Sequence, residues 1–278
     1  MLDLPVTVSK GKLSELVETL EIDNEHATAS ISLWGAQLLS FKPKHDSRER
    51  LFKSEKIILD GSASLRAGIP VCWPWFGQKE GCQKHGLVRT RPWQVLSTTE
   101  SADYTELVLA PVGISGKGFD GTAGISLTVQ IGKRLSVTLT TTNHGGGEFA
   151  FNAALHTYFL VDDIRTVELK GLSGMYSDKT RDWAMLETPE PYRFTEETDR
   201  IHLNPVEKVS IVQAASEIGV ESAGHDSVVV WNPWLEVSTN LRDLGAEGYL
   251  SMLCVETAVT QGKNLQAGEM HSLTQVIS

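Results

Sequence analysis

The amino-acid sequence predicts an all-β protein, a sandwich of antiparallel strands that forms one domain over residues 1–278. Short stretches of alternating apolar and polar residues recur along most of the chain, separated by turn signals, at intervals typical of sandwiches. Only one stretch has the spacing of an amphipathic helix. The chain contains no internal repeat, linker or low-complexity segment, and β-sandwiches of this length often fold as a single unit.

Composition and charge restrict the partners of the protein. The chain has 41% hydrophobic and 22% charged residues, as soluble globular proteins do, and a formal net charge of −10. This charge argues against binding to nucleic acid or to an anionic membrane, both of which require broad positive fields. A small anionic substrate is compatible with it if basic residues gather locally. We therefore expect a monomer that acts on a small molecule.

Neither targeting segments nor cysteine motifs are found. The first twelve residues lack the basic start and apolar core of a signal peptide, and no run approaches the roughly 18 apolar residues of a membrane span. We expect a cytoplasmic protein. Cys72, Cys82 and Cys254 are odd in number and lack CxxC spacing, so we interpret them as reduced thiols without a disulfide framework or a metal site.

The one predicted helix lies near the start of the chain, at Lys12–Leu20. Leu13, Leu16, Val17 and Leu20 recur there at intervals of three and four residues, which is the period of an amphipathic helix. After this segment the alternation has the two-residue period of strands.

The rest of the chain is predicted to form strands and turns. Gly61–Phe76 is too rich in glycine and proline for a regular element, and we interpret it as an ordered loop packed around its own tryptophans. Gly132-Lys133 is a two-residue hairpin signal, and Gly145–Gly147 turn the chain into the next strand. The predicted strands are Ala27–Trp34, Gln37–Phe41, Trp93–Ser97, Glu106–Ala110, Ile125–Ile131, Leu135–Thr141, Asn152–Phe159, Thr166–Leu169, Arg200–Leu203, Val209–Val212, Ser227–Trp231, Leu250–Val255 and Ser272–Ile277.

The strand Asn152–Phe159 carries a candidate catalytic residue, His156. One face of this strand is mostly apolar, while His156 shares the other face with Asn152 and Tyr158. An imidazole held on a rigid strand can donate or accept a proton near neutral pH. From this stretch alone, the alternative is a half-buried histidine that is satisfied by a backbone carbonyl.

A local excess of basic residues lies between Arg66 and Arg91. Arginine offers a planar fork of donors that suits carboxylate or phosphate, and lysine adds a point charge. Trp73 and Trp75 are flat apolar surfaces on which a sugar ring can lie; the alternative places them in the core, with the charges on a solvated rim. The stretch contains five basic residues and one acidic residue: Arg66, Lys79, Lys84, Arg89, Arg91 and Glu80.

Glu256 is the second candidate for acid–base chemistry. It ends an otherwise apolar strand and shares a face with Met252 and Cys254. Partial desolvation there raises a carboxyl pKa toward the range of a general base. An exposed glutamate at a strand end is the alternative. An imidazole and a carboxylate that face one cavity can run acid and base chemistry together.

Several common catalytic motifs are absent from the sequence. Residues 116–121 match GxGxxG, but the next residues alternate as a strand and do not open a helix, so the dinucleotide-binding context is missing. The sequence contains no GxxxxGK[ST], GxSxG or HExxH motif and no HxH pair. These absences argue against an NTPase, a serine hydrolase and a zinc enzyme.

Six segments together resemble a known family. In chain order they are AGIPVCWPWFG (67–77), HGLVR (85–89), NAALHTYF (152–159), ETDRIH (197–202), WNPW (231–234) and CVETA (254–258). They are similar to the hexose-6-phosphate mutarotases, or glucose-6-phosphate 1-epimerases, of the aldose 1-epimerase family, over nearly the whole chain. The resemblance implies a galactose mutarotase-like β-supersandwich, and an isomerase that interconverts the α and β anomers of hexose 6-phosphates without cofactor or metal.

The resemblance also implies roles for the two candidate catalytic residues. His156 would protonate the ring oxygen while Glu256 takes the proton from the C1 hydroxyl, so that the ring opens. Rotation about C1–C2 presents the other face of the aldehyde, and the same groups in reversed roles close the ring. Each positioned acid or base typically contributes about 10²–10⁴-fold.

Five further residues match substrate-binding positions of the family. Arg66 and Arg89 match positions that hold the phosphate, and Asp199 matches one that contacts the sugar. Lys84 matches a substrate-contacting position where some relatives are expected to have glutamine; its extra charge favours an anionic substrate. His85 matches a sugar-binding histidine of the broader family and ranks below His156.

The sequence leaves three other functions open. The protein could be an aldose 1-epimerase of unphosphorylated sugars, which Arg66 and Arg89 argue against. It could be a catalytically silent carbohydrate-binding or regulatory module that uses the same residues. If the protein were a purely structural sandwich, the basic cluster, His156 and Glu256 would have to occur together by chance.

Overall fold

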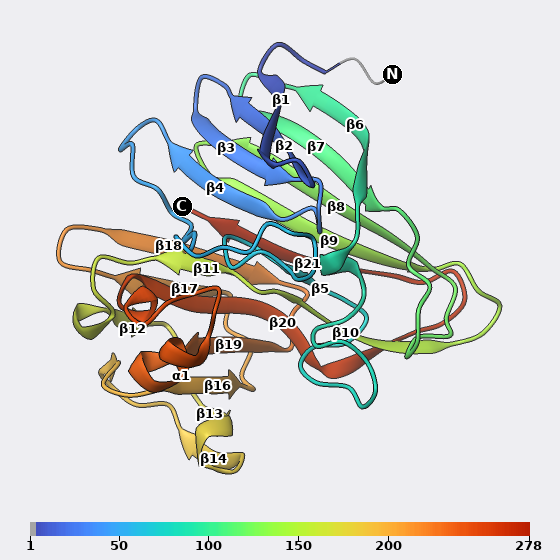
Figure 1. Ribbon diagram of the computed structural model, residues 1–278. Helices are drawn as coiled ribbons and strands as arrows, with labels where there is room; N and C mark the ends of the chain where they lie inside the picture. The colour runs from blue at the N-terminus through green and yellow to red at the C-terminus, as the bar shows by residue number, and fades with distance from the viewer. Residues whose placement is uncertain (1–3) are drawn as a thin grey trace.

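The computed structural model describes residues 4–278 and confirms an all-β protein (Figure 1). The first three residues of the predicted domain lie outside the described part. Within that part, the strands form three antiparallel sheets, and the single α-helix, α1 (Trp234–Asn240), has seven residues. No helix of residues 4–278 is long and apolar enough to span a bilayer.

A four-stranded sheet contains the N-terminal part of the described chain. Its strands follow one another in sequence order, so each is joined to the next by a hairpin turn. Figure 1 shows this sheet at the top, in blue. The strands are β1 (Val8–Ser14), β2 (Val17–Asp23), β3 (Ala27–Ser32) and β4 (Leu38–Pro43).

The largest sheet has nine strands, in the order β15-β12-β17-β18-β21-β9-β8-β7-β6. The four strands β6 to β9 form a meander, and the C-terminal strand β21 joins it to the remaining strands through an eight-residue ladder with β9. The strands are β6 (Trp93–Glu100), β7 (Tyr104–Pro111), β8 (Ala123–Gly132), β9 (Leu135–Asn143), β12 (Glu168–Lys170), β15 (Tyr192–Arg193), β17 (Lys208–Val212), β18 (Glu217–Ala223) and β21 (Met270–Ile277).

The third sheet has eight strands and carries the candidate site. Its order is β14-β13-β16-β19-β20-β10-β5, and β11 also pairs with the long strand β20. Segments far apart in the sequence therefore become neighbours along β20. The strands are β5 (Val71–Cys72), β10 (Phe149–Leu155), β11 (Tyr158–Leu160), β13 (Met175–Asp178), β14 (Ala184–Glu187), β16 (Thr198–His202), β19 (Ser227–Asn232) and β20 (Met252–Leu265).

Four short 3-10 helices complete the described elements. Two of them adjoin the candidate site, because η1 carries Arg89 and η3 carries Lys179. Their bounds are η1 (Val88–Thr90), η2 (Ile164–Thr166), η3 (Lys179–Arg181) and η4 (Gly248–Ser251).

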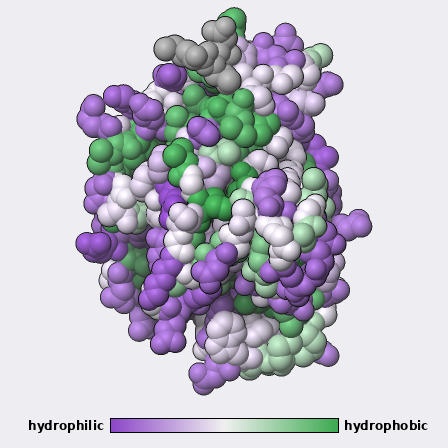
Figure 2. Space-filling model, turned by 90° about the vertical axis from the view of Figure 1, so that its right-hand side faces the viewer, coloured by the Kyte–Doolittle hydropathy of each residue, from purple (hydrophilic) through white to green (hydrophobic). Residues whose placement is uncertain are grey.

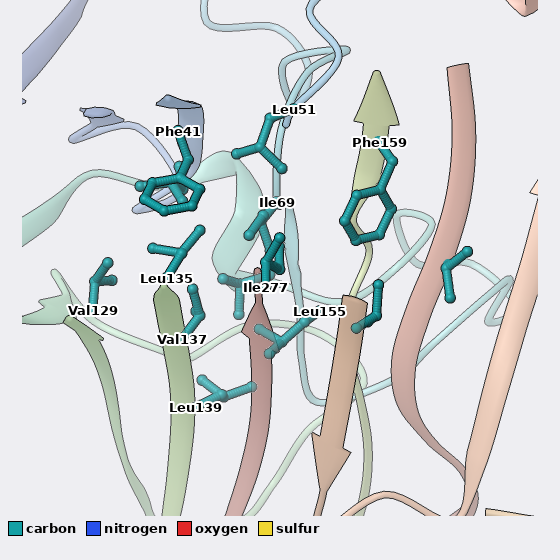
Figure 3. Close-up of a cluster of buried hydrophobic side chains, with 14 of the residues drawn as sticks. Phe41, Leu51, Ile69, Val129, Leu135, Val137, Leu139, Leu155, Phe159 and Ile277 are labelled. Carbon is teal, nitrogen blue, oxygen red and sulfur yellow. The ribbon is translucent and has the colours of Figure 1, made fainter. Parts of the chain in front are cut away.

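The main core lies between the sheets, where their apolar faces meet (Figure 3). Side chains from all three sheets contribute, such as Phe41 from β4, Leu139 from β9 and Phe159 from β11. Burial of such side chains stabilises the fold by about 1.5–3 kcal/mol each relative to exposure. Since one face of the strand pair β10–β11 is committed to this core, the other face is free for polar side chains.

The surface shows no single apolar face in the view of Figure 2, where hydrophilic side chains cover most of the molecule and hydrophobic ones gather in the upper part. The large hydrophobic residues that are exposed come from separate elements and include Leu16, Leu96, Met175 and Trp183. Trp183 alone of these four borders the candidate site, through its contact with Lys179.

The predicted helix at Lys12–Leu20 is wrong. This segment spans the turn between β1 and β2 and parts of both strands. Val17 and Leu20 are buried on opposite faces of β2, Leu20 in the main core and Val17 in a smaller cluster with Leu39 and Leu65, whereas Leu16 is exposed in the turn. Because β2 is covered on both faces, its apolar residues do not alternate, and their spacing coincides with that of a helix.

Most predicted strands are confirmed, with shifts at their ends. The Gly132-Lys133 signal does join two strands, although the turn itself is Lys133-Arg134 and Ile131 pairs with Leu135. The loop Gly61–Phe76 is irregular as expected, except for the short strand β5. Strands β1, β2, β13, β14, β15 and β18 and helix α1 were not predicted from the sequence.

Candidate active site

The sequence predicted that His156 lies within a strand, but the residue lies at a break between two strands. Strand β10 ends at Leu155 and β11 begins at Tyr158. The His156 backbone N–H donates to the carbonyl of Pro70 at 3.0 Å, so the loop before β5 holds the residue in place. The alternation was predicted correctly, because Leu155 and Phe159 face the core while His156 faces the opposite side.

Glu256 lies in the interior of β20, paired opposite Val229 of β19. The prediction that it ends its strand is wrong, because β20 continues to Leu265. The side chain is 1% exposed, so the alternative of an exposed glutamate is also excluded. A carboxyl on a central strand of a sheet is rigidly held and largely stripped of water.

These two residues form a close pair. His156 Nδ1 lies 3.3 Å from Glu256 Oε1, and it also lies 3.8 Å from the thiol sulfur of Cys254. The second carboxylate oxygen, Oε2 of Glu256, is buried without a hydrogen-bond partner among the described residues. A buried acceptor without a partner is costly, and such groups are common where a substrate completes the hydrogen bonding.

Burial shifts both ionisation equilibria toward the neutral forms. Loss of water raises the pKa of the Glu256 carboxyl well above its usual range; Lys179 opposes this rise and Asp199 adds to it. Loss of water likewise lowers the pKa of His156, and the charges of Arg89 and Arg66 lower it further. Both shifts favour a proton on the carboxyl over a proton on the imidazole in the free protein.

Aromatic rings surround His156 on several sides. Tyr158 stacks on the imidazole with ring centroids 5.0 Å apart and planes at 11°. Trp231 and Phe76 approach its edges at 6.2 and 6.3 Å. These contacts fix the orientation of the ring and exclude water from it, which is what a proton-transfer group requires.

His85 lies beside His156, with ring centroids 5.2 Å apart. Its Nδ1 accepts a hydrogen bond from the Gly77 N–H at 3.2 Å, so a neutral ring carries its proton on Nε2. Burial and the charge of His156 lower its pKa below the ordinary range. The residue has a left-handed backbone with φ of 65°, a conformation that is uncommon for non-glycine residues but more frequent for histidine than for most.

Arg66 is already paired. Its guanidinium forms two 3.1 Å hydrogen bonds with the carboxylate of Asp243 and donates to the Tyr158 hydroxyl at 2.8 Å. Loss of water alone would lower the Arg66 pKa, but Tyr158 and Asp243 outweigh it and raise the pKa. The charge of Arg66 is thus largely compensated, and the guanidinium braces the tyrosine that stacks on His156.

Arg89 and Lys84 differ from Arg66 in having no ion-pair partner in residues 4–278. Arg89 lies in η1 and is partly buried, and its charge lowers the pKa of the His156 imidazole. Partial loss of water and the charge of Lys179 lower the pKa of Lys84. Asp199 offsets part of the Lys84 charge, and the two cations together still make a local positive field beside the acid–base pair of an acidic protein.

Asp199, predicted to contact the sugar, forms an ion pair with Lys179 at 3.0 Å. The Lys179 ammonium also lies 5.6 Å from the ring centres of both Phe76 and Trp183. Lys179 belongs to η3, directly after β13, and was not identified from the sequence. No motif marks this segment, since only pairing of β13 with β16 brings it to Asp199.

The expectation that Trp73 and Trp75 offer a surface for a sugar ring is wrong. Both side chains are buried: Trp73 packs on Phe119, and Trp75 donates to the Gln83 carbonyl. The alternative, that these tryptophans belong to the core, is confirmed. Trp231, from the WNPW segment, is the tryptophan that contacts His156.

The structure thus assembles the predicted residues around one centre. His156, Glu256 and His85 are in contact or nearly so, and Arg66, Arg89 and Lys84 influence the ionisation of His156. Asp199 influences that of Glu256. Lys179 and Asp243 were missed from the sequence, whereas strand alternation had placed Tyr158 on the face of His156 and Cys254 on the face of Glu256 without giving either a role.

The comparisons with known proteins agree with this geometry. The family model described as aldose 1-epimerase matches residues 18–278. A protein of Escherichia coli strain K12 named "Putative glucose-6-phosphate 1-epimerase" is 34% identical over 259 residues, covering 90% of this chain and 86% of its own. A protein of the same name from Cenchrus ciliaris is 32% identical over 257 residues, covering 87% and 78%.

Solved structures show the same fold. A crystal structure described as a "putative mutarotase" from Salmonella typhimurium has a TM-score of 0.91 and 30% identity, covering 100% of this chain and 95% of that one. A galactose mutarotase-like protein from Clostridium acetobutylicum has a TM-score of 0.72 at 13% identity, which shows the fold alone, over 98% and 97% of the two chains. With a galactose mutarotase-like fold and a family match over nearly its whole length, this chain belongs to the aldose 1-epimerase family.

Proposed function

We propose that the protein is a glucose-6-phosphate 1-epimerase, which interconverts the α and β anomers of aldohexose 6-phosphates. The observation that carries this proposal is the pairing of His156 with Glu256 at 3.3 Å, near Arg89 and Lys84, which form no ion pair within residues 4–278. The pair supplies acid–base chemistry, and the cations supply attraction for a dianionic phosphate. The relatives named as glucose-6-phosphate 1-epimerases support the same substrate class.

The reaction requires one proton to be given and one to be taken. His156 as imidazolium gives its proton to the ring oxygen, and the Glu256 carboxylate takes the proton from the C1 hydroxyl. The C1–O5 bond breaks and the C1 oxygen becomes the aldehyde oxygen. His156 is then neutral and Glu256 is protonated. After rotation about C1–C2 the same steps run in reverse, and the site returns to its starting state.

Substrate charge would prepare the pair for this step. In the free protein, burial favours a proton on Glu256, while Arg89, Arg66 and Lys84 disfavour imidazolium. A phosphate dianion placed against Arg89 and Lys84 compensates these charges and raises the pKa of His156. Imidazolium, which the reaction needs, thereby becomes less unfavourable, while the pKa of Glu256, which Arg89 and Lys84 also lower, rises as well.

The remaining residues would bind the sugar. Asp199 and His85 are oriented toward the same centre, by the ion pair with Lys179 and by the hydrogen bond from Gly77. A carboxylate accepts from ring hydroxyls and the His85 Nε2–H donates to a hydroxyl oxygen. Trp231 offers its ring beside His156 as an apolar wall for the sugar.

A second candidate function is an aldose 1-epimerase of unphosphorylated sugars. The observation that favours it is the pairing of Arg66 with Asp243, which compensates one of the two arginines expected to hold the phosphate. Arg89, which lacks such a partner, argues for the phosphorylated substrate.

The test is the rate of α/β exchange measured by NMR exchange spectroscopy, with glucose 6-phosphate and glucose as parallel substrates. Wild type should accelerate exchange of the phosphorylated sugar, and His156→Ala and Glu256→Gln should each reduce the rate about 10²–10⁴-fold. Equal acceleration of both sugars would favour the second candidate. Absence of acceleration by folded wild type would refute both enzyme functions.

A further inference from the structure

Cys254 has no part in the proposed reaction, yet its thiol is fully buried against the acid–base pair. The sulfur lies 3.8 Å from His156 Nδ1, which in turn lies 3.3 Å from Glu256 Oε1. One ligand atom from each of the three residues lies within 4.8 Å of the other two. Tyr158 opposite Cys254 and the pairing of β20 with β19 hold this arrangement rigidly.

Two of the three distances between these atoms are close to those of a tetrahedral zinc site, and the third, from sulfur to Oε1, lies within 4.8 Å. Zinc bonds of about 2.3 Å to sulfur and about 2.0–2.2 Å to nitrogen and oxygen place the nitrogen and oxygen ligands about 3.4 Å apart. The same bond lengths place sulfur and nitrogen about 3.6 Å apart. The observed 3.3 and 3.8 Å agree within a few tenths of an ångström.

The unsatisfied carboxylate oxygen is a second, independent sign of a missing ligand. Oε2 of Glu256 is buried without a hydrogen-bond partner among residues 4–278. A metal ion held by Oε1, or a water molecule in its fourth coordination position, would compensate this oxygen. Three protein ligands with one open position are typical of accessible zinc sites.

The ligand chemistry favours zinc over magnesium or calcium. Thiolate and imidazole are soft or borderline ligands, which bind Zn²⁺ well and the harder ions poorly. A thiolate and a carboxylate together neutralise the two charges of the ion. This neutrality limits the repulsion from Arg66, Arg89, Lys84 and Lys179, which surround the site.

We propose that His156, Cys254 and Glu256 form an inhibitory binding site for Zn²⁺. Bonds form from the metal to Nδ1, the Cys254 sulfur and the Glu256 carboxylate, and the thiol proton and the carboxyl proton are released to solvent. Coordination occupies the carboxylate that must accept the C1 hydroxyl proton. Metal binding itself is independent of the proposed function; only the inhibition rests on it.

Binding is tested with the metal alone. Zinc is titrated into the full-length protein by calorimetry, and cobalt is added as a spectroscopic substitute whose absorption reveals a thiolate ligand. Wild type should bind one ion with a thiolate-to-cobalt band. Cys254→Ser should lose the band. Replacing a residue that only supports a metal ligand costs about 10–100-fold in affinity, and loss of the ligand itself should weaken binding by more than that.

Two further cysteines serve as matched controls. Cys72→Ser removes another buried thiol, and Cys82→Ser removes the partly exposed one; both should bind zinc as wild type does. Circular dichroism checks that each variant is folded. Unchanged zinc binding in Cys254→Ser, or binding lost in Cys82→Ser, would overturn the proposal in favour of an adventitious surface site.

Inhibition is tested by NMR exchange of glucose 6-phosphate anomers with zinc added and then removed by a chelator. Zinc should slow exchange by wild type reversibly, while the rate of Cys254→Ser, relative to its own zinc-free rate, should stay constant. Zinc that binds wild type without slowing it would contradict the inhibitory role. If wild type binds zinc through Cys254 but never accelerates exchange, the metal site stands and the epimerase function fails.

Discussion

The guanidinium of Arg66 forms two hydrogen bonds with the carboxylate of Asp243, a residue 177 positions away in the sequence. Arg89, the other arginine matched to phosphate recognition, has no carboxylate within ion-pair distance in residues 4–278. The two arginines therefore have different tasks. Arg66 holds Tyr158 and through it the plane of His156, whereas Arg89 has its charge available for a ligand.

Removal of Arg89 should separate phosphate recognition from catalysis. A hydrogen bond to a charged group is worth about 1.5–3 kcal/mol, so Arg89→Ala should raise KM for glucose 6-phosphate about 10–100-fold. The KM for glucose should change little. Arg193→Ala, which removes an exposed arginine paired with Glu168 at the edge strand β15, is the matched control. Equal losses with both sugars would show that Arg89 does not read the phosphate.

Replacement of Glu256 by glutamine should increase stability in a pH-dependent way. The native pKa of this carboxyl lies above 4.5, the ordinary value, so the native state keeps a proton that the unfolded state loses as pH rises past 4.5. The buried carboxyl therefore lowers the free energy of unfolding of wild type above pH 4.5 and not below it. The gain of Glu256→Gln should be near zero at pH 4 and about 1–3 kcal/mol at pH 7.

Urea unfolding of both proteins at several pH values measures this difference. Glu187→Gln changes an exposed glutamate of β14 and should show no such trend. A gain for Glu256→Gln that is the same at pH 4 and pH 7 would contradict a raised carboxyl pKa.

Lys179 and Asp199 should shift the pH profile of activity in opposite directions. Lys179 opposes the rise in the Glu256 pKa and Asp199 increases it. Since Glu256 acts as a base, its pKa sets the acidic limb of the profile. Lys179→Met should move that limb to higher pH, and Asp199→Asn should move it to lower pH. Shifts of both variants in the same direction would exclude this electrostatic coupling.

The pH dependence of kcat for anomer exchange measures these shifts. Arg181→Met is a suitable control, because Arg181 follows Lys179 by two residues in η3 but pairs with Glu196. Its profile should coincide with that of wild type.

Gly86 should tolerate no side chain. It has a φ of 84°, and an added Cβ would lie 2.0 Å from the carbonyl oxygen of Trp73. That oxygen accepts from the Leu87 N–H, so neither backbone can move without breaking the contact next to His85. Gly86→Ala should destabilise the fold by at least about 2 kcal/mol. Gly146→Ala, where nothing lies within 4 Å, should change stability by less than about 0.5 kcal/mol.

Much of the site could be predicted because strand alternation is local. The pattern in residues 151–159 assigned Leu155 and Phe159 to the core and His156 to the other face, and the structure agrees. The same reasoning failed at Lys12–Leu20, because Val17 and Leu20 are buried on opposite faces of β2 and only the tertiary structure shows that both faces are covered.

By itself, the sequence determined the all-β class, the face of each long strand and the family. The class and the strand faces follow from the order of side chains along each segment, and the family follows from the six segments that resemble it. Tertiary structure alone decided which charges are compensated, because Asp243 reaches Arg66 and Lys179 reaches Asp199 across the fold. It also decided that Glu256 is buried beside His156 and Cys254, since only the pairing of β20 with its neighbours removes water from that carboxyl.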